Sequence, residues 1–205
     1  MTNVPVGESH KPVTVLFFGS QGSGKGTQVK LLMEYLSAQS NRKIIQIDMG
    51  QLLRDAAERK DHTGEIINYF LINGLRVPDF LPTYLQTKKL IDSFTGEEHI
   101  IADGLARGAD QTRAFDDMML FYNRHDLQII DMQISEDTAV ERLVKRGRND
   151  DTPEAIRNRL GWYKTDVIPQ LEMLRERGRT IHVIDGEPDV DTIHHSILKS
   201  LGLEK

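Results

Sequence analysis

Several features are missing from this sequence, and each absence excludes a class of protein. There is no cysteine, so disulfides, thiolate catalysis and cysteine-based zinc sites are excluded. No apolar run approaches the roughly 20 residues that span a bilayer, and the first dozen residues lack the apolar core of a signal peptide. We therefore expect a cytoplasmic protein with no membrane partner, in which residues 1–12 form a flexible leader.

A surplus of positive charge is missing too. The chain has 26 Lys and Arg against 31 Asp and Glu, a formal net charge of -5, whereas nonspecific nucleic-acid binding needs a basic surface. We expect no nucleic-acid partner. The remaining composition is ordinary for a globular protein, with 39% hydrophobic and 28% charged residues among 205. That length predicts one domain over residues 13–205.

Five short apolar runs rich in β-branched residues predict strands, with helical patterns between them. They cover residues 13–18, 43–48, 99–103, 127–134 and 180–185. Strands that alternate with helices predict a three-layer α/β/α fold with a five-stranded parallel sheet. After the second run the helical pattern is too long for one crossover, so we predict a small helical insertion over residues 49–80. A long helical pattern over residues 152–177 contains Pro169, which should kink it.

The first strand is followed at once by the loop Gly19-Ser-Gln-Gly-Ser-Gly-Lys-Gly-Thr27 and a helical pattern. Glycines let successive backbone N–H groups turn toward an anion, and the start of a helix favours negative charge there. Lys25 would contact the β and γ phosphates, and the Thr27 hydroxyl could hold magnesium. The alternative is a tight turn with a surface lysine, but the order strand, loop, helix favours a phosphate site.

Acidic and basic residues follow the strand ends that share this rim. Asp103 ends the third predicted strand, where P-loop proteins place a carboxylate that steadies magnesium, directly or through water. The alternative is an acid that caps a turn. Arg54 and Arg107 each follow a strand end and could serve a second anion, although a single arginine of this kind is more often a surface residue.

A positive cluster lies further along the chain. Residues 142–159 contain six Lys or Arg against three Asp or Glu. Arg142 and Arg146 are four apart and share a helical face, while Arg148 lies in a tight turn. A solvated charged face is the usual meaning of such a run, but here the cluster should lie across the rim from the phosphate loop.

At these residues the chain resembles the adenylate kinase family of nucleoside monophosphate kinases, over about residues 13–201. The phosphate loop has that family's spacing, with the threonine displaced by one place. The segment 50–54 resembles the start of the monophosphate-binding insertion, and 74–79 resembles its second substrate loop. The segment 103–107, with Gln111, resembles the part that holds the monophosphate and its base.

The resemblance implies a set of site residues. ATP would be bound by Gly22, Ser23, Gly24, Lys25, Gly26, Thr27, Arg142 and Arg146. The monophosphate would be bound by Met49, Arg54, Leu75, Arg76, Val77, Gly104, Arg107, Gln111, Arg148 and Arg159. Catalysis would rest on Lys25, Arg107, Arg146, Arg148 and Arg159, with magnesium held by Thr27 and by Asp103 through water.

The resemblance also implies a short lid over residues 147–151 in place of the long form that can hold zinc, so we expect Mg2+ with ATP and no zinc. Some positions depart from the family pattern. Gln21 replaces a proline, Met49 a threonine, Gln51 an acid, and Leu105-Ala106 a Phe-Pro pair. Most of these border the monophosphate, so the acceptor base stays open.

The implied function is reversible phosphoryl transfer from MgATP to AMP by a monomer, giving two ADP. A UMP/CMP or broad-specificity kinase is the alternative that Met49 favours. An alternative of another class is a P-loop ATPase or nucleotide-binding regulator, since fold does not fix function. A kinase should consume ATP only when an acceptor is present.

Overall fold

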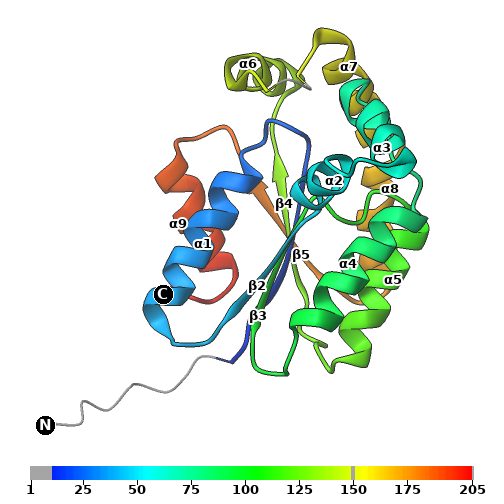
Figure 1. Cartoon of the computed structure of the whole chain (residues 1–205). Helices are drawn as coiled ribbons and strands as arrows, with labels where there is room; N and C mark the ends of the chain where they lie inside the picture. The colour runs from blue at the N-terminus through cyan, green and yellow to red at the C-terminus, as the bar shows by residue number, and fades with distance from the viewer. Residues whose placement is uncertain (1–10, 149–150, 205) are drawn as a thin grey trace, which may run out of the picture.

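A computed structural model describes residues 11–148 and 151–204. Within them, five strands form one parallel sheet in the order β2-β3-β1-β4-β5 (Figure 1). They are β1 (Thr14–Gly19), β2 (Ile44–Asp48), β3 (His99–Asp103), β4 (Gln128–Gln133) and β5 (Thr180–Asp185). The five predicted strands are therefore confirmed, with ends that shift by one residue in places.

Helices cover both faces of the sheet, as the predicted three-layer fold requires (Figure 1). They are α1 (Lys25–Gln39), α2 (Met49–Ala57), α3 (His62–Ile72), α4 (Phe80–Ser93), α5 (Ala109–Phe121), α6 (Glu136–Arg146), α7 (Pro153–Trp162), α8 (Ile168–Glu176) and α9 (Val190–Ser200). No helix of the described residues is long and apolar enough to cross a membrane.

Two hydrophobic cores follow from the alternation of side chains along β1. Val15 and Phe17 pack with α1 and α9, whereas Leu16 and Phe18 pack with α4, α5 and α8. All four side chains are almost completely buried. A strand buried on both faces must be apolar at every position, which explains the continuous apolar run in the sequence.

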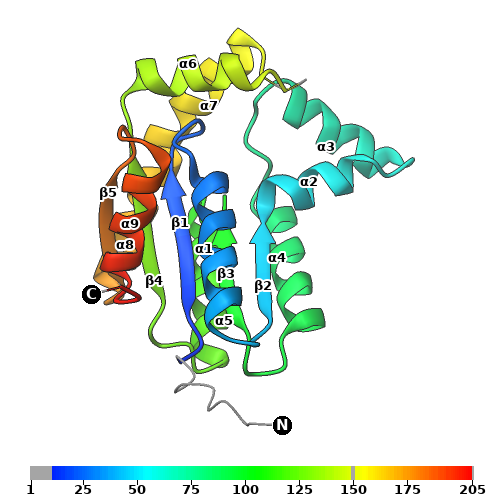
Figure 2. The ribbon, with the colours of Figure 1, turned by 90° about the vertical axis from the view of Figure 1, so that its left-hand side faces the viewer.

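The carboxyl ends of the strands form a rim that is flanked by two helical units. Figure 2 shows α2 and α3 projecting beyond β2 on one side, while α6 and α7 lie over the opposite side. The segment 49–80 thus holds α2, α3 and the connection to α4. Residues 1–10 of the expected leader, and Asn149 and Asp150 of the expected lid, lie outside the described residues.

The long helix expected over residues 152–177 is interrupted. A π-helical turn, η1 (Tyr163–Val167), separates α7 from α8. Pro169 lies in the first turn of α8, and its ring and missing N–H are incompatible with an ordinary helical bond to Thr165. The predicted distortion therefore takes the form of a wide turn that begins ahead of the proline. Such turns are frequent at functional sites.

Candidate functional site

The loop between β1 and α1 has backbone conformations that only glycine adopts easily. Gly22 has φ 88, and a Cβ there would lie 2.7 Å from the carbonyl oxygen of Ala139. Gly24, with φ 91, precedes α1, and no side chain caps the first N–H groups of that helix. The N–H of Thr27 donates to the carbonyl of Gly24 at 3.0 Å, which leaves the N–H groups of Lys25 and Gly26 available to an anion.

Lys25 is the first residue of α1, and its ammonium group folds back over the loop. Nζ donates to the carbonyl oxygens of Gly19 and Ser20, both at 2.8 Å, and lies 3.4 Å from Ser23 Oγ. Burial lowers the pKa of Lys25, while the charge of Asp103 opposes that change. The loop carbonyls thus hold the Lys25 ammonium group at the loop, and phosphate oxygens can replace them as hydrogen-bond acceptors.

Asp103 offers a carboxylate oxygen next to this lysine. It ends β3, where its Cα is in register with Asp48 of β2, and its buried Oδ1 has no hydrogen-bond partner among the described residues. Burial raises the pKa of Asp103, and the charge of Lys25 opposes the rise. Magnesium usually takes one or two carboxylates together with phosphate oxygens and water. A single orphaned oxygen fits that chemistry.

Arg107 is a second cation near Asp103. Its Cζ lies 5.4 Å from the centroid of the Trp162 ring. A Cβ at Gly104 would lie 2.9 Å from Arg107 Nη2, so the glycine leaves room for the guanidinium. Burial lowers the pKa of Arg107, and the charges of Asp103 and Asp48 oppose this change. The cation is therefore fixed by an aromatic face and by neighbouring acids.

Asp151 holds an arginine at the end of α6 and one in α7. Its Oδ2 accepts from Arg146 Nε and its Oδ1 from Arg146 Nη2, both at 2.8 Å. Oδ1 also accepts from Arg159 Nη2 at 2.8 Å. Burial alone would raise the pKa of Asp151, but the hydrogen bond and charge of Arg146 and the charge of Arg159 outweigh it, so the pKa is lowered. The backbone N–H of Arg148 lies 3.4 Å from Oδ2.

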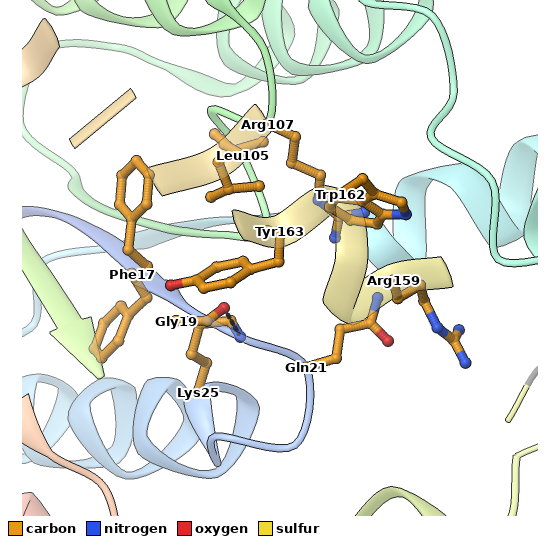
Figure 3. A pocket seen from close by; sticks show the side chains of 12 residues that line it. Phe17, Gly19, Gln21, Lys25, Leu105, Arg107, Arg159, Trp162 and Tyr163 are labelled. Carbon is orange, nitrogen blue, oxygen red and sulfur yellow. Dashed lines mark hydrogen bonds between the residues drawn. The ribbon is translucent and has the colours of Figure 1, made fainter. Parts of the chain in front are cut away.

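Lys25, Arg107, Arg159 and Trp162 line one small cavity of about 30 Å³ (Figure 3). Of the predicted site residues, it brings together Lys25, Gly104, Arg107 and Arg159. Figure 3 shows Lys25 and Arg107 entering from opposite sides, with the Tyr163 ring among them. A space of this size holds little more than water, so a phosphate group does not fit inside it in this conformation.

The predicted acceptor residues lie on both sides of the rim. Met49 is fully buried and Val77 nearly so. Gln111 is buried, and its Oε1 accepts from the backbone N–H of Arg107 at 2.9 Å. Arg54 Nη2 donates to Gln51 Oε1 at 3.0 Å.

The connection between α3 and α4 is attached to α7. Trp162 Nε1 donates to the carbonyl of Gly74 at 3.0 Å, and Arg76 Nε lies 3.0 Å from Asp166 Oδ2. Leu75 between them keeps 38% of its surface exposed. The two helical units that flank the rim are thus in direct contact here.

Other predicted residues lie outside the small cavity. Arg142 Nη1 donates to the carbonyl of Gly186 at 3.0 Å, and Gly26 and Thr27 are exposed on the first turn of α1. The sequence reasoning also missed residues that the structure brings in. From the sequence, Asp151 is only the last residue of the expected lid, and Trp162 has no predicted role, although it is the only tryptophan of the chain.

Most of the chain is similar in sequence to known proteins of one family. A family model described as "Adenylate kinase" matches residues 17–179. The adenylate kinase of Mycolicibacterium smegmatis is 34% identical over 188 residues, covering 92% of this chain and 98% of the relative. That of Bifidobacterium longum is 32% identical over 195 residues, covering 91% and 98%. "Adenylate kinase 1" of a Nostoc species is 29% identical over 188 residues, covering 92% and 98%.

Proposed function

Because the chain belongs to the adenylate kinase family, we infer that it catalyses reversible transfer of the γ-phosphoryl group from magnesium-bound ATP to AMP, giving two ADP. The observation that supports this most directly is the convergence of Lys25, Arg107 and Arg159 on one cavity beside the phosphate loop. Positive charge on both sides of a transferring phosphoryl group is what this reaction needs.

On the ATP side, we assign the phosphates to the backbone of residues 22–27 and to Lys25. The uncapped N–H groups at the start of α1 support this assignment. Arg146, held by Asp151, would meet the same phosphates. Arg142 is assigned to the nucleoside of ATP, since its guanidinium lies beside the carbonyl of Gly186 outside the small cavity.

On the AMP side, we assign the phosphate to arginines and the base to the buried polar set near α5. Arg54 and Arg107 would bind the AMP phosphate, and Arg148 and Arg159 would bind the phosphoryl group in transit. Gln111 is assigned to the base because its buried amide lies next to Arg107. The remaining contacts are assigned to Met49, Leu75, Arg76, Val77 and Gly104.

The acceptor phosphate is already anionic at neutral pH, so no side chain need remove a proton. Alignment of donor and acceptor and stabilisation of charge can account for the catalysis. Asp103 and Thr27 are the residues that would hold magnesium, which when bound neutralises charge on the β and γ phosphates. The absence of zinc stays a prediction.

The small cavity also indicates that the site opens to bind nucleotides. We propose that residues 49–80 are the unit that binds AMP and that residues 147–151 are a short lid. Closing both over the nucleotides would exclude water, which would otherwise take the phosphoryl group. Since every assigned residue comes from one chain, we propose that the protein acts as a monomer. A cytoplasmic location stays a prediction.

Incubation with Mg2+ and ADP alone tests this function. A kinase of this type must convert ADP into equal amounts of ATP and AMP with no free phosphate, whereas an ATPase or a nucleotide-binding regulator forms neither product. Lys25→Met should abolish most of this activity. Lys30→Met is the matched control, because Lys30 is an exposed lysine of the same helix, and it should react like the parent protein. No formation of ATP, or AMP that forms together with free phosphate in place of ATP, would overturn the proposal.

A further inference from the structure

A second and larger cavity lies on the other side of Tyr163. It has a volume of about 380 Å³ and is lined by Ser20, the end of β4, the start of α6, and residues of α7, η1 and α8. Among the described residues, Tyr163 lines both this cavity and the small one. Sites for small ligands begin at about 300 Å³, so this space can hold an organic molecule. The function proposed above makes no use of it.

One buried carboxylate in this cavity lacks a partner. Asp131 lies within β4, in register with Phe18 of β1 and Val183 of β5, and only 4% of its surface is exposed. Its Oδ2 accepts from Gln133 Nε2 at 2.8 Å. Its Oδ1 is buried and has no hydrogen-bond partner in the part of the chain that the structure describes. A buried acceptor without a donor is costly, and native proteins usually satisfy it.

The cations near Asp131 are occupied elsewhere. Lys25 and Arg175 both act on its pKa through charge, but Lys25 donates to the phosphate loop and Arg175 to Glu172. Burial raises the pKa of Asp131, and Lys25 only partly opposes the rise. The fold therefore leaves one position open for a donor, and that donor gains most if it is positively charged.

The other walls favour a ligand with an apolar body. Met132, Ile134, Leu160, Ile168 and Leu171 line the cavity together with the Tyr163 ring. Its second acid, Glu136, is exposed and already paired with Lys164. A bare divalent cation does not fit, because magnesium or calcium needs about six oxygen ligands and Asp131 offers one free oxygen. An ammonium or amidinium group on an apolar or aromatic body matches both the charge and the walls.

We propose that this cavity is a second ligand site, which binds a small organic cation through an N–H group donated to Asp131 Oδ1. The apolar body of the ligand packs against Leu160 and Ile168. The ligand then lies beside Ser20, whose carbonyl accepts from Lys25 Nζ. The proposal goes beyond phosphoryl transfer, and its test needs no catalytic activity.

Benzamidine is a suitable probe, with neutral benzamide of the same shape as its control. Titrated into the full-length ¹⁵N-labelled protein, benzamidine should give saturable shifts of the amide signals of Ser20, Met132 and Tyr163 in the millimolar range. Benzamide should bind at least about tenfold more weakly, a difference of about 1.4 kcal/mol. Equal binding of the two probes, or no saturable shift at these amides, would overturn the proposal.

Two variants test whether benzamidine binds in this cavity. Asp131→Asn keeps the shape and removes the charge, so it should weaken benzamidine about tenfold. Glu141→Gln is the control, because Glu141 is an exposed acid of α6 outside the cavity lining, and it should bind like the parent. If Asp131→Asn does not fold, Ile168→Trp replaces it. Ile168 is 43% exposed, so a larger ring can be accommodated and should block the cavity while Asp131 stays intact. Unchanged binding to a folded Asp131→Asn or to Ile168→Trp contradicts the assignment.

Discussion

Arg159 is held by Asp151 through a hydrogen bond of 2.8 Å between Nη2 and Oδ1, with 5% and 1% of the two side chains exposed. The same carboxylate accepts from Arg146. One buried acid thus fixes the positions of two cations that we assign to the transferring phosphates.

Asp151→Asn should therefore lower activity by displacing Arg146 and Arg159. We expect kcat to fall about 100-fold, because the two arginines lose their alignment. The free energy of unfolding should fall by about 3 kcal/mol, because the buried Arg159 and the partly exposed Arg146 lose a charged partner. Steady-state kinetics and urea unfolding measure both. The exposed Asp137, replaced by Asn, is the control and should change stability by no more than about 0.5 kcal/mol. A fully active Asp151→Asn would contradict this role.

Trp162 should report on the acceptor site by its fluorescence. It is the only tryptophan, and the guanidinium of Arg107 lies over its ring. AMP bound to Arg107 should change the field of the guanidinium over the ring and hence the emission, whereas Arg107→Ala should respond weakly to AMP. Replacing Trp162 by Leu removes a contact worth about 1 kcal/mol, so the KM for AMP should rise about fivefold. An unchanged KM in that variant would mean that the ring does not position Arg107.

Ala106 has φ 55 and is fully buried, directly before Arg107. Proline fixes φ near −65°, so this backbone differs from the one that the family's Phe-Pro pair would allow. Ala106→Pro should cost about 3 kcal/mol of stability and displace Arg107. Ala106→Gly is the control, because glycine adopts positive φ without strain, and it should fold and react normally. A stable and active Ala106→Pro would show that the segment adopts another conformation.

Glu98 predicts a pH dependence of stability. Burial alone would raise its pKa, but hydrogen bonds from the Thr95 hydroxyl and from the N–H groups of Thr95 and Gly96 outweigh it and lower the pKa to about 2. Because the pKa of Glu98 is lower in the folded than in the unfolded protein, where it is about 4.3, the ionised group stabilises the folded state at pH above that value. This contribution is lost as the pH falls toward 2.

Glu98→Gln should thus cost about 2 kcal/mol at pH 7, because a charged acceptor is lost, and less at pH 3. Urea unfolding at the two pH values measures the difference. The neighbouring Glu97, with 79% of its side chain exposed, is the matched control: Glu97→Gln should have a small effect at both. If Glu98→Gln lowers the free energy of unfolding by the same amount at both pH values, the pKa of Glu98 is not lowered in the folded protein.

The sheet and the phosphate loop could be predicted because their signals are local. The strands are short runs rich in apolar and β-branched residues, and the glycines, lysine and helix start of the loop are adjacent in the sequence. The rim then follows from topology alone, which places Asp48 beside Asp103. No contact between distant segments had to be known.

The remaining features depend on contacts that the sequence does not encode locally. Asp151 lies among acids and arginines that could pair in many ways, and the stacking of Trp162 on Arg107 joins α7 to the segment after β3. Asp131 lies within an apolar strand, where an isolated acid gives no sign of its environment. The π-helical turn likewise leaves no pattern beyond Pro169.

Phosphorus NMR of MgATP with the purified protein, alone and with AMP, CMP, UMP or GMP in separate tubes, shows directly whether the protein transfers a phosphoryl group to AMP. We expect ADP in the AMP tube, stable ATP where no acceptor is present, and loss of transfer in Arg107→Ala and Lys25→Met. Faster transfer to CMP or UMP would make this a pyrimidine kinase and Met49 the residue to replace by threonine. Free phosphate in every tube, or intact ATP in all of them, would contradict the account.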